Sequence, residues 1–134
     1  MTPYFLLCAE KASRTTEGTI VLHGVIERLF VKDEPTAEKP FTIPTMSIVF
    51  ELRDADIANP HAVRVQLMHR ETKTSLFDHT MRVEPSKDPS NKITGLLNFH
   101  LLPIKAFGAY EMSVEVDGTF VAANSFFVVP APAM

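Results

Sequence analysis

The sequence has one cysteine, no tryptophan, and five glycines that stand singly, and these shortages exclude several classes of protein. Because Cys8 has no second cysteine to pair with, the fold must be stable without an intramolecular disulfide, and a reducing compartment suits it best. Without a glycine-rich loop, the chain has no cradle for a nucleotide phosphate. We therefore expect a protein with no disulfide and no cofactor.

The chain also lacks an excess of either charge and any long hydrophobic run. Its 13 basic and 16 acidic residues are interspersed and give a formal net charge of −3, so there is no basic stripe of the kind that binds nucleic acid. No stretch approaches the roughly 20 apolar residues of a membrane-spanning helix. A length of 134 residues, 46% of them hydrophobic, is typical of one globular domain. We expect a single domain over residues 1–134 that binds neither nucleic acid nor a membrane.

The apolar run at residues 4–9 is the candidate for a targeting segment. It is too short for a signal peptide, which has a basic start and a longer apolar region. Leu6-Leu7-Cys8 faintly resembles a bacterial lipoprotein cleavage sequence, but seven residues before Cys8 leave no room for an export segment. We favour a cysteine buried in a strand of a cytoplasmic protein, where apolar surroundings raise the thiol pKa and make the thiol inert.

Apolar and polar residues alternate with a period of two in five segments, as they do in strands that bury one face. These segments are residues 46–53, 63–68, 77–83, 97–101 and 110–117. Three others, residues 4–11, 19–31 and 119–129, are more continuously apolar, which predicts strands covered on both faces or lying at an interface. About eight strands result, and no segment with a convincing helical pattern is left.

Two local signals refine these strands. Gly24 lies inside the long apolar segment at residues 19–31, where it predicts a bulge or a switch of the chain between two sheets. Asp117 and Gly118 separate two strand patterns and form the strongest hairpin signal in the chain.

The residues around Tyr110 bear on the choice between a sandwich and a closed barrel, since eight strands suit either. In immunoglobulin-like domains a tyrosine opens the penultimate strand, follows a glycine by two residues, and bonds through its hydroxyl to the preceding connection. Gly108 and Tyr110 have this spacing. The alternative is a tyrosine that merely begins a strand after a turn. We predict an all-β, immunoglobulin-like antiparallel β-sandwich that turns a tyrosine corner at Gly108 and Tyr110.

Two stretches also resemble a known family. Residues 5–13 (FLLCAEKAS) and 108–118 (GAYEMSVEVDG) are similar to an uncharacterised bacterial domain family of predicted immunoglobulin-like fold. The resemblance spans nearly the whole chain. It implies the same sandwich fold and carries no established activity to transfer.

No arrangement of reactive side chains indicates an enzyme, and we expect no catalytic residues. The histidines lack the close pairings that zinc favours, and no serine stands in a glycine-flanked elbow. His69 and His79 fall in step with the inward residues of neighbouring predicted strands, so a meeting across a hairpin at residues 70–75 is one reading of them. Ordinary core histidines are the simpler interpretation.

Polar side chains collect in four connections that antiparallel strands would bring to one end of the sandwich. These connections are residues 13–18, 54–61, 85–92 and 117–118. Converging carboxylates suit calcium, whereas polar loops held in water and offset by nearby lysines are the alternative. The calcium candidates are Asp54, Asp56, Asp88 and Asp117. A carbohydrate or another small polar ligand is a further possibility at this end, at Asp54, Asn59, His61, Asp88 and Asn91.

The last predicted strand is apolar on both faces. If it ends a sheet, one face must meet a second subunit, the strand at residues 4–11, or solvent. We predict an interface that includes Phe120, Val121, Phe127 and Val129. The preceding strand has an acidic row, which indicates either cross-strand ion pairs or a surface for a basic partner. Its members are Glu111, Ser113, Glu115 and Asp117.

The sequence alone therefore ranks functions without assigning one. The first hypothesis is a non-enzymatic module that binds another protein, possibly an identical copy in a homo-oligomer. The second is a sandwich that binds a small ligand, a carbohydrate or calcium at the loop end. An enzyme would need a general acid and base or a metal in one cleft, and the sequence offers no such set.

Overall fold

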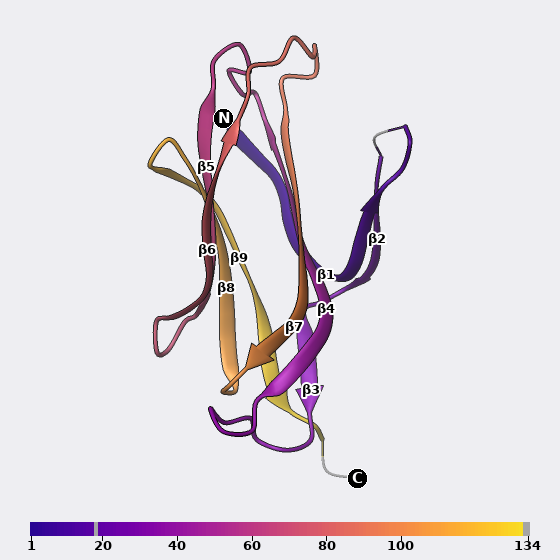
Figure 1. Ribbon diagram of the computed structural model, residues 1–134, viewed down its shortest axis with the longest axis vertical. Helices are drawn as coiled ribbons and strands as arrows, with labels where there is room; N and C mark the ends of the chain where they lie inside the picture. Colours follow the sequence, from indigo (N-terminus) through magenta and orange to yellow (C-terminus); the bar gives the residue numbers. More distant parts are fainter. Residues whose placement is uncertain (18, 133–134) are drawn as a thin grey trace.

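The computed structural model describes residues 1–17 and 19–132, which form nine strands. The strands are β1 (Thr2–Arg14), β2 (Ile20–Val25), β3 (Arg28–Val31), β4 (Phe41–Arg53), β5 (His61–His69), β6 (Thr74–Val83), β7 (Ile93–Ile104), β8 (Gly108–Val116) and β9 (Thr119–Pro130) (Figure 1). Among the described residues no helix is long and apolar enough to cross a membrane. Gly18, which ends one predicted connection, and residues 133–134 of the predicted domain lie outside this description.

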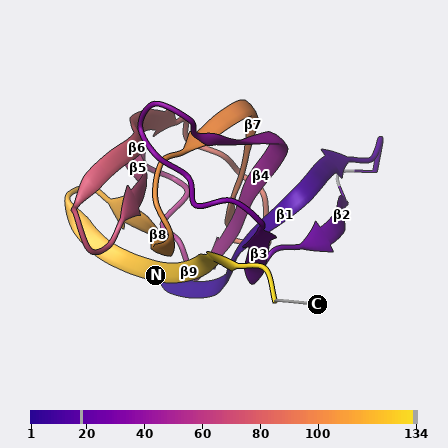
Figure 2. The same ribbon diagram turned by 90° about the horizontal axis from the view of Figure 1, so that it is seen from below.

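The strands form two sheets that pack face to face, as the view along the sandwich in Figure 2 shows. One sheet has the order β2-β1-β4-β7 and the other has the order β3-β9-β8-β5-β6. The prediction of an all-β sandwich without a disulfide is confirmed. The expectation of wholly antiparallel pairing is wrong at one place, because β3 runs parallel to β9.

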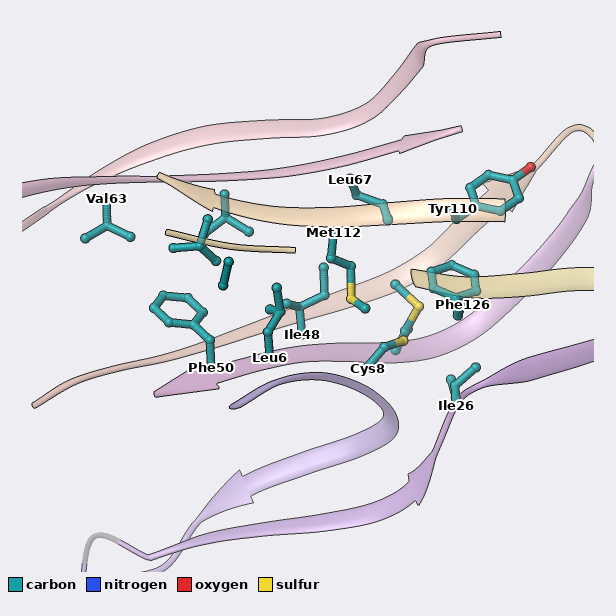
Figure 3. Packing of buried hydrophobic residues seen from close by; sticks show 14 of the residues in the cluster. Leu6, Cys8, Ile26, Ile48, Phe50, Val63, Leu67, Tyr110, Met112 and Phe126 are labelled. Carbon is teal, nitrogen blue, oxygen red and sulfur yellow. The ribbon is translucent and has the colours of Figure 1, made fainter. Parts of the chain in front are cut away.

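The inward residues of the alternating strands fill the space between the sheets (Figure 3). In β8 every second residue from Tyr110 to Val116 is buried, as the period of two predicts. Phe50 of β4 lies opposite Gly95 of β7, and a Cβ added at Gly95 would lie 2.2 Å from the Phe50 ring. Burial of one such phenylalanine stabilises a fold by about 1.5–3 kcal/mol. Gly95 therefore has a packing role, since any side chain there would displace Phe50.

The segment predicted as one strand at residues 19–31 is two strands in different sheets. β2 pairs with β1, whereas β3 pairs with β9. Between them, the amide of Ile26 donates a 2.7 Å hydrogen bond to the carbonyl of Cys8. Gly24 has a φ of 67°, which glycine adopts without steric cost. The predicted switch between sheets is present in this segment, but it falls between β2 and β3, after Gly24, and no bulge lies at Gly24. The split explains why the described residues form nine strands rather than eight.

Strand β4 is buried on both of its faces, which corrects the single buried face predicted for residues 46–53. Ser47, Val49 and Glu51 alternate with the core residues of β4 and so point away from the core, yet all three are buried. Ala9 of the neighbouring strand β1 is buried as well. A further layer must therefore cover the outer face of this sheet.

The hairpin of β1 and β2 provides this cover. Thr94 of β7 lies in the same cross-strand row as Phe5 of β1, since both are paired with Glu51. Nevertheless Arg14, near the end of β1, reaches the carbonyl of Thr94 with a 3.4 Å hydrogen bond. A straight strand rises about 3.3 Å per residue and would carry Arg14 far from that row. The second half of β1 therefore turns back beside β4 and β7, as Figure 1 shows, and buries Ala12 against them.

Candidate interaction surface

The predicted interface residues lie on β9, which the sequence analysis considered as the strand that ends a sheet. β9 does not end the sheet but lies between β8 and β3. Among the described residues, β3 covers the edge of β9 only along residues 127–130. The first half of β1 lies beside β9 before residue 127, since the Asn124 side chain donates a 2.8 Å hydrogen bond to the carbonyl of Leu6.

A β-bulge in β9 turns Phe120 toward the outer face. Glu115 of β8 pairs with Phe120, whereas the residue before Glu115 pairs with Ala122, so Val121 is the extra residue. Directly opposed residues of antiparallel strands point to the same face. Phe120 therefore points outward with Glu115, and strict alternation along β9 would have placed it on the core face.

Three of the four predicted interface residues share this outer face. Phe127 and Val129 point outward because Phe126, with which they alternate, is fully buried in the core. Val121 is the exception, since it packs against the core cluster. The structure thus gathers Phe120, Phe127 and Val129 on one surface and leaves Val121 out of it.

Strand β3 adds a residue that the sequence analysis missed. Phe30 pairs with Val129 in the parallel ladder and points outward beside it. Phe30, Phe120 and Phe127 are 59%, 62% and 40% exposed. The sequence predicts a single strand over residues 19–31, and this prediction does not reveal that Phe30 lies beside Val129. We call Phe30, Phe120, Phe127 and Val129 the β3–β9 face.

The charged residues beside this face are paired with one another. Arg70 lies 3.4 Å from Glu111, and Arg64 lies 2.7 Å from Asp78 and 3.6 Å from Glu115. Hydrogen bonds from Arg64 lower the pKa of the Asp78 carboxyl. The acidic row on β8 therefore forms cross-strand ion pairs, which favours that interpretation over a surface for a basic partner.

The predicted tyrosine corner has the expected hydrogen bond. The hydroxyl of Tyr110 donates to the carbonyl of Ala106 at 2.6 Å, and burial raises the pKa of Tyr110. Gly108 has a φ of 129°, and a Cβ added there would lie 2.8 Å from Nε2 of His69. The corner thus needs glycine at this position both for its backbone conformation and for the close approach of His69.

His69 and His79 do not meet. His69 is buried and pairs with Thr74 across the turn, with one ring nitrogen bonded to Thr72 and the other to the carbonyl of Phe107. His79 is exposed on the edge strand β6. The interpretation of His69 as a satisfied core histidine is confirmed, and the idea of a histidine pair across the hairpin is wrong.

Three of the four connections predicted to share one end of the sandwich contact one another there. The amide of Ser86 donates to the carbonyl of Ile57 at 2.7 Å, which joins the β6–β7 and β4–β5 loops. His61, at the start of β5, bonds to Asp117 of the β8–β9 turn at 2.6 Å. The prediction that these three connections share one end of the sandwich is confirmed, and their polar groups bond to one another there.

His61 is held between two acceptors. Its Nδ1 lies 2.6 Å from the Asp117 carboxylate, and its Nε2 contacts the carbonyl of Asp56. The amide of Ala62 donates to the other Asp117 oxygen at 2.9 Å. The bond to Asp117 raises the pKa of His61, while the bonds from Ala62 and His61 lower the pKa of Asp117. The pair is suited to a charged imidazolium facing a carboxylate.

The other carboxylates of these loops accept hydrogen bonds from nearby nitrogens. Asp56 accepts from Asn59 at 2.6 Å, and Asp88 accepts from the amide of Ser90 at 2.9 Å. In the part of the chain that the structure describes, no group of three or more histidine, cysteine or acidic side chains is arranged to hold a metal ion. The four calcium candidates are therefore not arranged as ligands of one ion; they are Asp54, Asp56, Asp88 and Asp117.

Comparison with protein families gives a match over nearly the whole chain. Residues 3–129 match DUF6941, a family of unknown function. The chain belongs to this family. The match extends from the start of β1 to the end of β9, so it includes both sheets. None of the curated proteins compared with this DUF6941 chain matches it.

Solved structures align with the DUF6941 chain at low sequence identity. The Pseudomonas fluorescens alkylpurine DNA glycosylase AlkC, bound to DNA containing an abasic site analogue, aligns with 92% of the chain and 30% of its own length, at 10% identity and a TM-score of 0.44. A β-glucosidase from Listeria innocua in complex with isofagomine aligns with 96% of the chain and 16% of its own length, at 10% identity and a TM-score of 0.46. The chain spans less than a third of either protein.

The single thiol of the DUF6941 chain belongs to the core cluster. Cys8 is buried in the core on β1, and this burial raises its pKa to about 12. The thiolate is the reactive form of cysteine, so a thiol with this pKa is a poor nucleophile at neutral pH. The prediction of a pKa raised by an apolar strand is confirmed.

Proposed function

We propose that the chain is a non-enzymatic assembly module that binds a protein partner, in the first instance a second copy of itself, through the β3–β9 face. The observation that carries this proposal is the exposure of Phe30, Phe120 and Phe127 on one surface of one sheet. Aromatic residues are enriched at protein interfaces, and apolar groups gathered on one surface mark such sites more often than scattered ones.

The arrangement of the aromatic side chains favours an identical copy. Phe30 and Phe127 lie at one end of the β3–β9 face, and Phe120 lies at the other end. A two-fold axis near the middle of β9 sets the Phe127 end of one copy against the Phe120 end of the other. The two phenylalanines at one end of each copy then pack against the single phenylalanine of the second copy, and this contact removes all three from water.

We further propose the immunoglobulin-like type for this sandwich. Two observations support it: Tyr110 bonds back to Ala106 at 2.6 Å, and the corner strand β8 lies between β9 and β5 in the middle of its sheet. Strands F, G and C of immunoglobulin-like domains have this relationship. A bacterial, cytoplasmic protein is part of the proposal, and the buried, reduced Cys8 supports the compartment.

The oligomeric mass tests the assembly proposal. At high micromolar concentration, light scattering after size-exclusion chromatography should give about twice the chain mass of 15.0 kDa. The variant with both Phe30→Ser and Phe127→Ser should elute as a monomer. Leu101→Asn is the matched control, because Leu101 is 70% exposed on the other sheet, and asparagine tolerates its φ of 56°. A wild-type monomer at every concentration, or loss of the dimer in the control alone, contradicts the proposal.

A further inference from the structure

A pocket of about 400 Å³ lies at the tyrosine corner, at the end of the sandwich away from the aspartate-rich loops. It opens where the start of β6 and the end of β7, the edge strands of the two sheets, leave the core uncovered between them. Its lining residues are His69, Thr72, Thr74, Ser75, Leu76, Leu102, Pro103, Lys105, Ala106 and Tyr110. This volume lies in the range of pockets that hold small organic molecules.

The apolar wall of the pocket is rigid. The Tyr110 ring stacks on Phe126 with centroids 5.4 Å apart, and it lies 4.9 Å from the His69 ring (Figure 3 shows Tyr110 and Phe126). The hydroxyl of Tyr110 is fixed by its bond to Ala106. Leu76 and Leu102 complete the apolar part of the lining. A ligand body that is flat and apolar can pack here without moving the core.

The hydrogen bonds around His69 determine which donors and acceptors of this wall remain for a ligand. The Phe107 carbonyl can only accept, so Nε2 of His69 donates to it at 2.8 Å. Nδ1 then carries a lone pair, and the Thr72 amide donates to it at 3.3 Å. The Thr72 hydroxyl lies 2.8 Å from Nδ1 and 2.8 Å from the Thr74 hydroxyl. A hydroxyl oxygen has two lone pairs, so the exposed Thr74 oxygen keeps at least one of them whichever threonine donates, and it can accept a hydrogen bond from a ligand.

Lys105 supplies the charge at the pocket. Its ammonium takes part in no ion pair among the described residues, and none of the lining residues is acidic. A lysine in a lining that has no acidic residue favours an anionic ligand.

We infer that this pocket binds a small organic acid that has a flat apolar body, a carboxylate and a hydroxyl group. The carboxylate meets the Lys105 ammonium, the body lies against Tyr110 and Leu102, and the hydroxyl donates to Thr74. The site is independent of the β3–β9 face, so it holds whether or not the chain forms a dimer.

Three related probes test the inference by saturation-transfer NMR and by chemical-shift mapping on the labelled protein. The probe 4-hydroxyphenylacetate has all three features, phenylacetate lacks the hydroxyl, and tyramine carries an ammonium in place of the carboxylate. Affinity should fall in that order, with shifts mapping to residues 69–76 and 102–110. Binding of tyramine as tight as that of 4-hydroxyphenylacetate overturns the inference, as does absence of binding by all three at millimolar concentration.

Two variants assign the polar groups. Lys105→Gln should weaken 4-hydroxyphenylacetate about tenfold, since hydrogen bonds to charged groups are the stronger ones. Thr74→Val should weaken 4-hydroxyphenylacetate more than phenylacetate, which has no hydroxyl to lose. Thr80→Val on the same strand and Lys87→Gln at the opposite end are matched controls and should bind as the wild type does. Unchanged affinity in both pocket variants refutes the assignment.

Discussion

The hydroxyl of Tyr110 donates a 2.6 Å hydrogen bond to the backbone carbonyl of Ala106, four residues earlier in the chain. This bond ties the start of β8 to the connection that leads in from β7. Because the Tyr110 side chain is buried among core residues, water competes less for this bond than it would at the surface.

Removal of this hydroxyl should lower stability without changing the fold. We expect Tyr110→Phe to reduce the free energy of unfolding by about 1 kcal/mol, because the carbonyl of Ala106 loses its buried partner. Urea denaturation followed by far-ultraviolet circular dichroism measures the change. Tyr4→Phe, at an exposed site, is the control and should have almost no effect. Equal stability of Tyr110→Phe and the wild type would show that the corner bond is not formed.

Gly108 is expected to be more sensitive to substitution than Gly118. Both have positive φ values, 129° and 82°, so alanine strains the backbone at either site by about 1–3 kcal/mol. Only at Gly108 does the new Cβ also meet His69, at 2.8 Å, whereas at Gly118 it meets nothing within 4 Å. Gly108→Ala should therefore be the less stable variant in the same urea assay. If Gly118→Ala is destabilised equally, His69 does not constrain the corner.

The His61–Asp117 pair should make stability depend on pH. The folded-state pKa of His61 is raised above 6.5, so its contribution is complete below that pH and is lost as pH rises through the folded pKa. The pKa of Asp117 is lowered from 3.8, so its contribution is present above 3.8 and is lost as pH falls through the folded value. The pair therefore stabilises the fold most between about pH 4 and 6.5.

Thermal unfolding of His61→Gln tests this window. Its melting temperature should lie below that of the wild type at pH 5.5, and the difference should shrink as the pH rises through the folded-state pKa of His61 toward pH 9. His23→Gln, at an exposed position of β2, controls for the loss of a histidine as such. A difference that is constant with pH, or larger at pH 9, would mean that the pair is not an ion pair.

A substitution at Val49 distinguishes the observed structure, in which both faces of β4 are buried, from the predicted one, in which only one face is buried. Its side chain lies on the outer face of β4 and is fully buried under the β1–β2 hairpin. We expect Val49→Ala to cost about 1–3 kcal/mol, as truncation in a core does. Val21→Ala, at an exposed site of the hairpin, should change stability by less than about 0.5 kcal/mol. A negligible loss at Val49 would mean that the hairpin does not cover this sheet.

The parts of the fold that sequence could predict are those governed by local pattern. The alternation of apolar residues in β8 determines its buried face, because successive strand residues point to opposite sides. The spacing of Gly108 and Tyr110 likewise identifies the corner, since its hydrogen bond spans only four residues. Burial of Val49 could not be predicted in this way, because it depends on a hairpin that folds back from another part of the chain.

Only part of the candidate β3–β9 face could be predicted from local pattern. Phe127 and Val129 follow from alternation alone. The outward turn of Phe120 depends on the bulge at Val121, which appears only when the register between β8 and β9 is known. Phe30 depends on a parallel pairing between segments about a hundred residues apart, and no local pattern reports such a contact.

A cysteine cross-link tests most directly whether the β3–β9 face joins two copies of the chain. Ala123 is exposed on β9 between Phe120 and Phe127, and the buried native Cys8 does not compete for the reagent. The account predicts that a short bis-maleimide links Ala123→Cys protein rapidly into a covalent dimer and leaves Thr80→Cys protein, altered on β6 of the same sheet, monomeric. Equal cross-linking of the two variants, or no covalent dimer from Ala123→Cys, would contradict it.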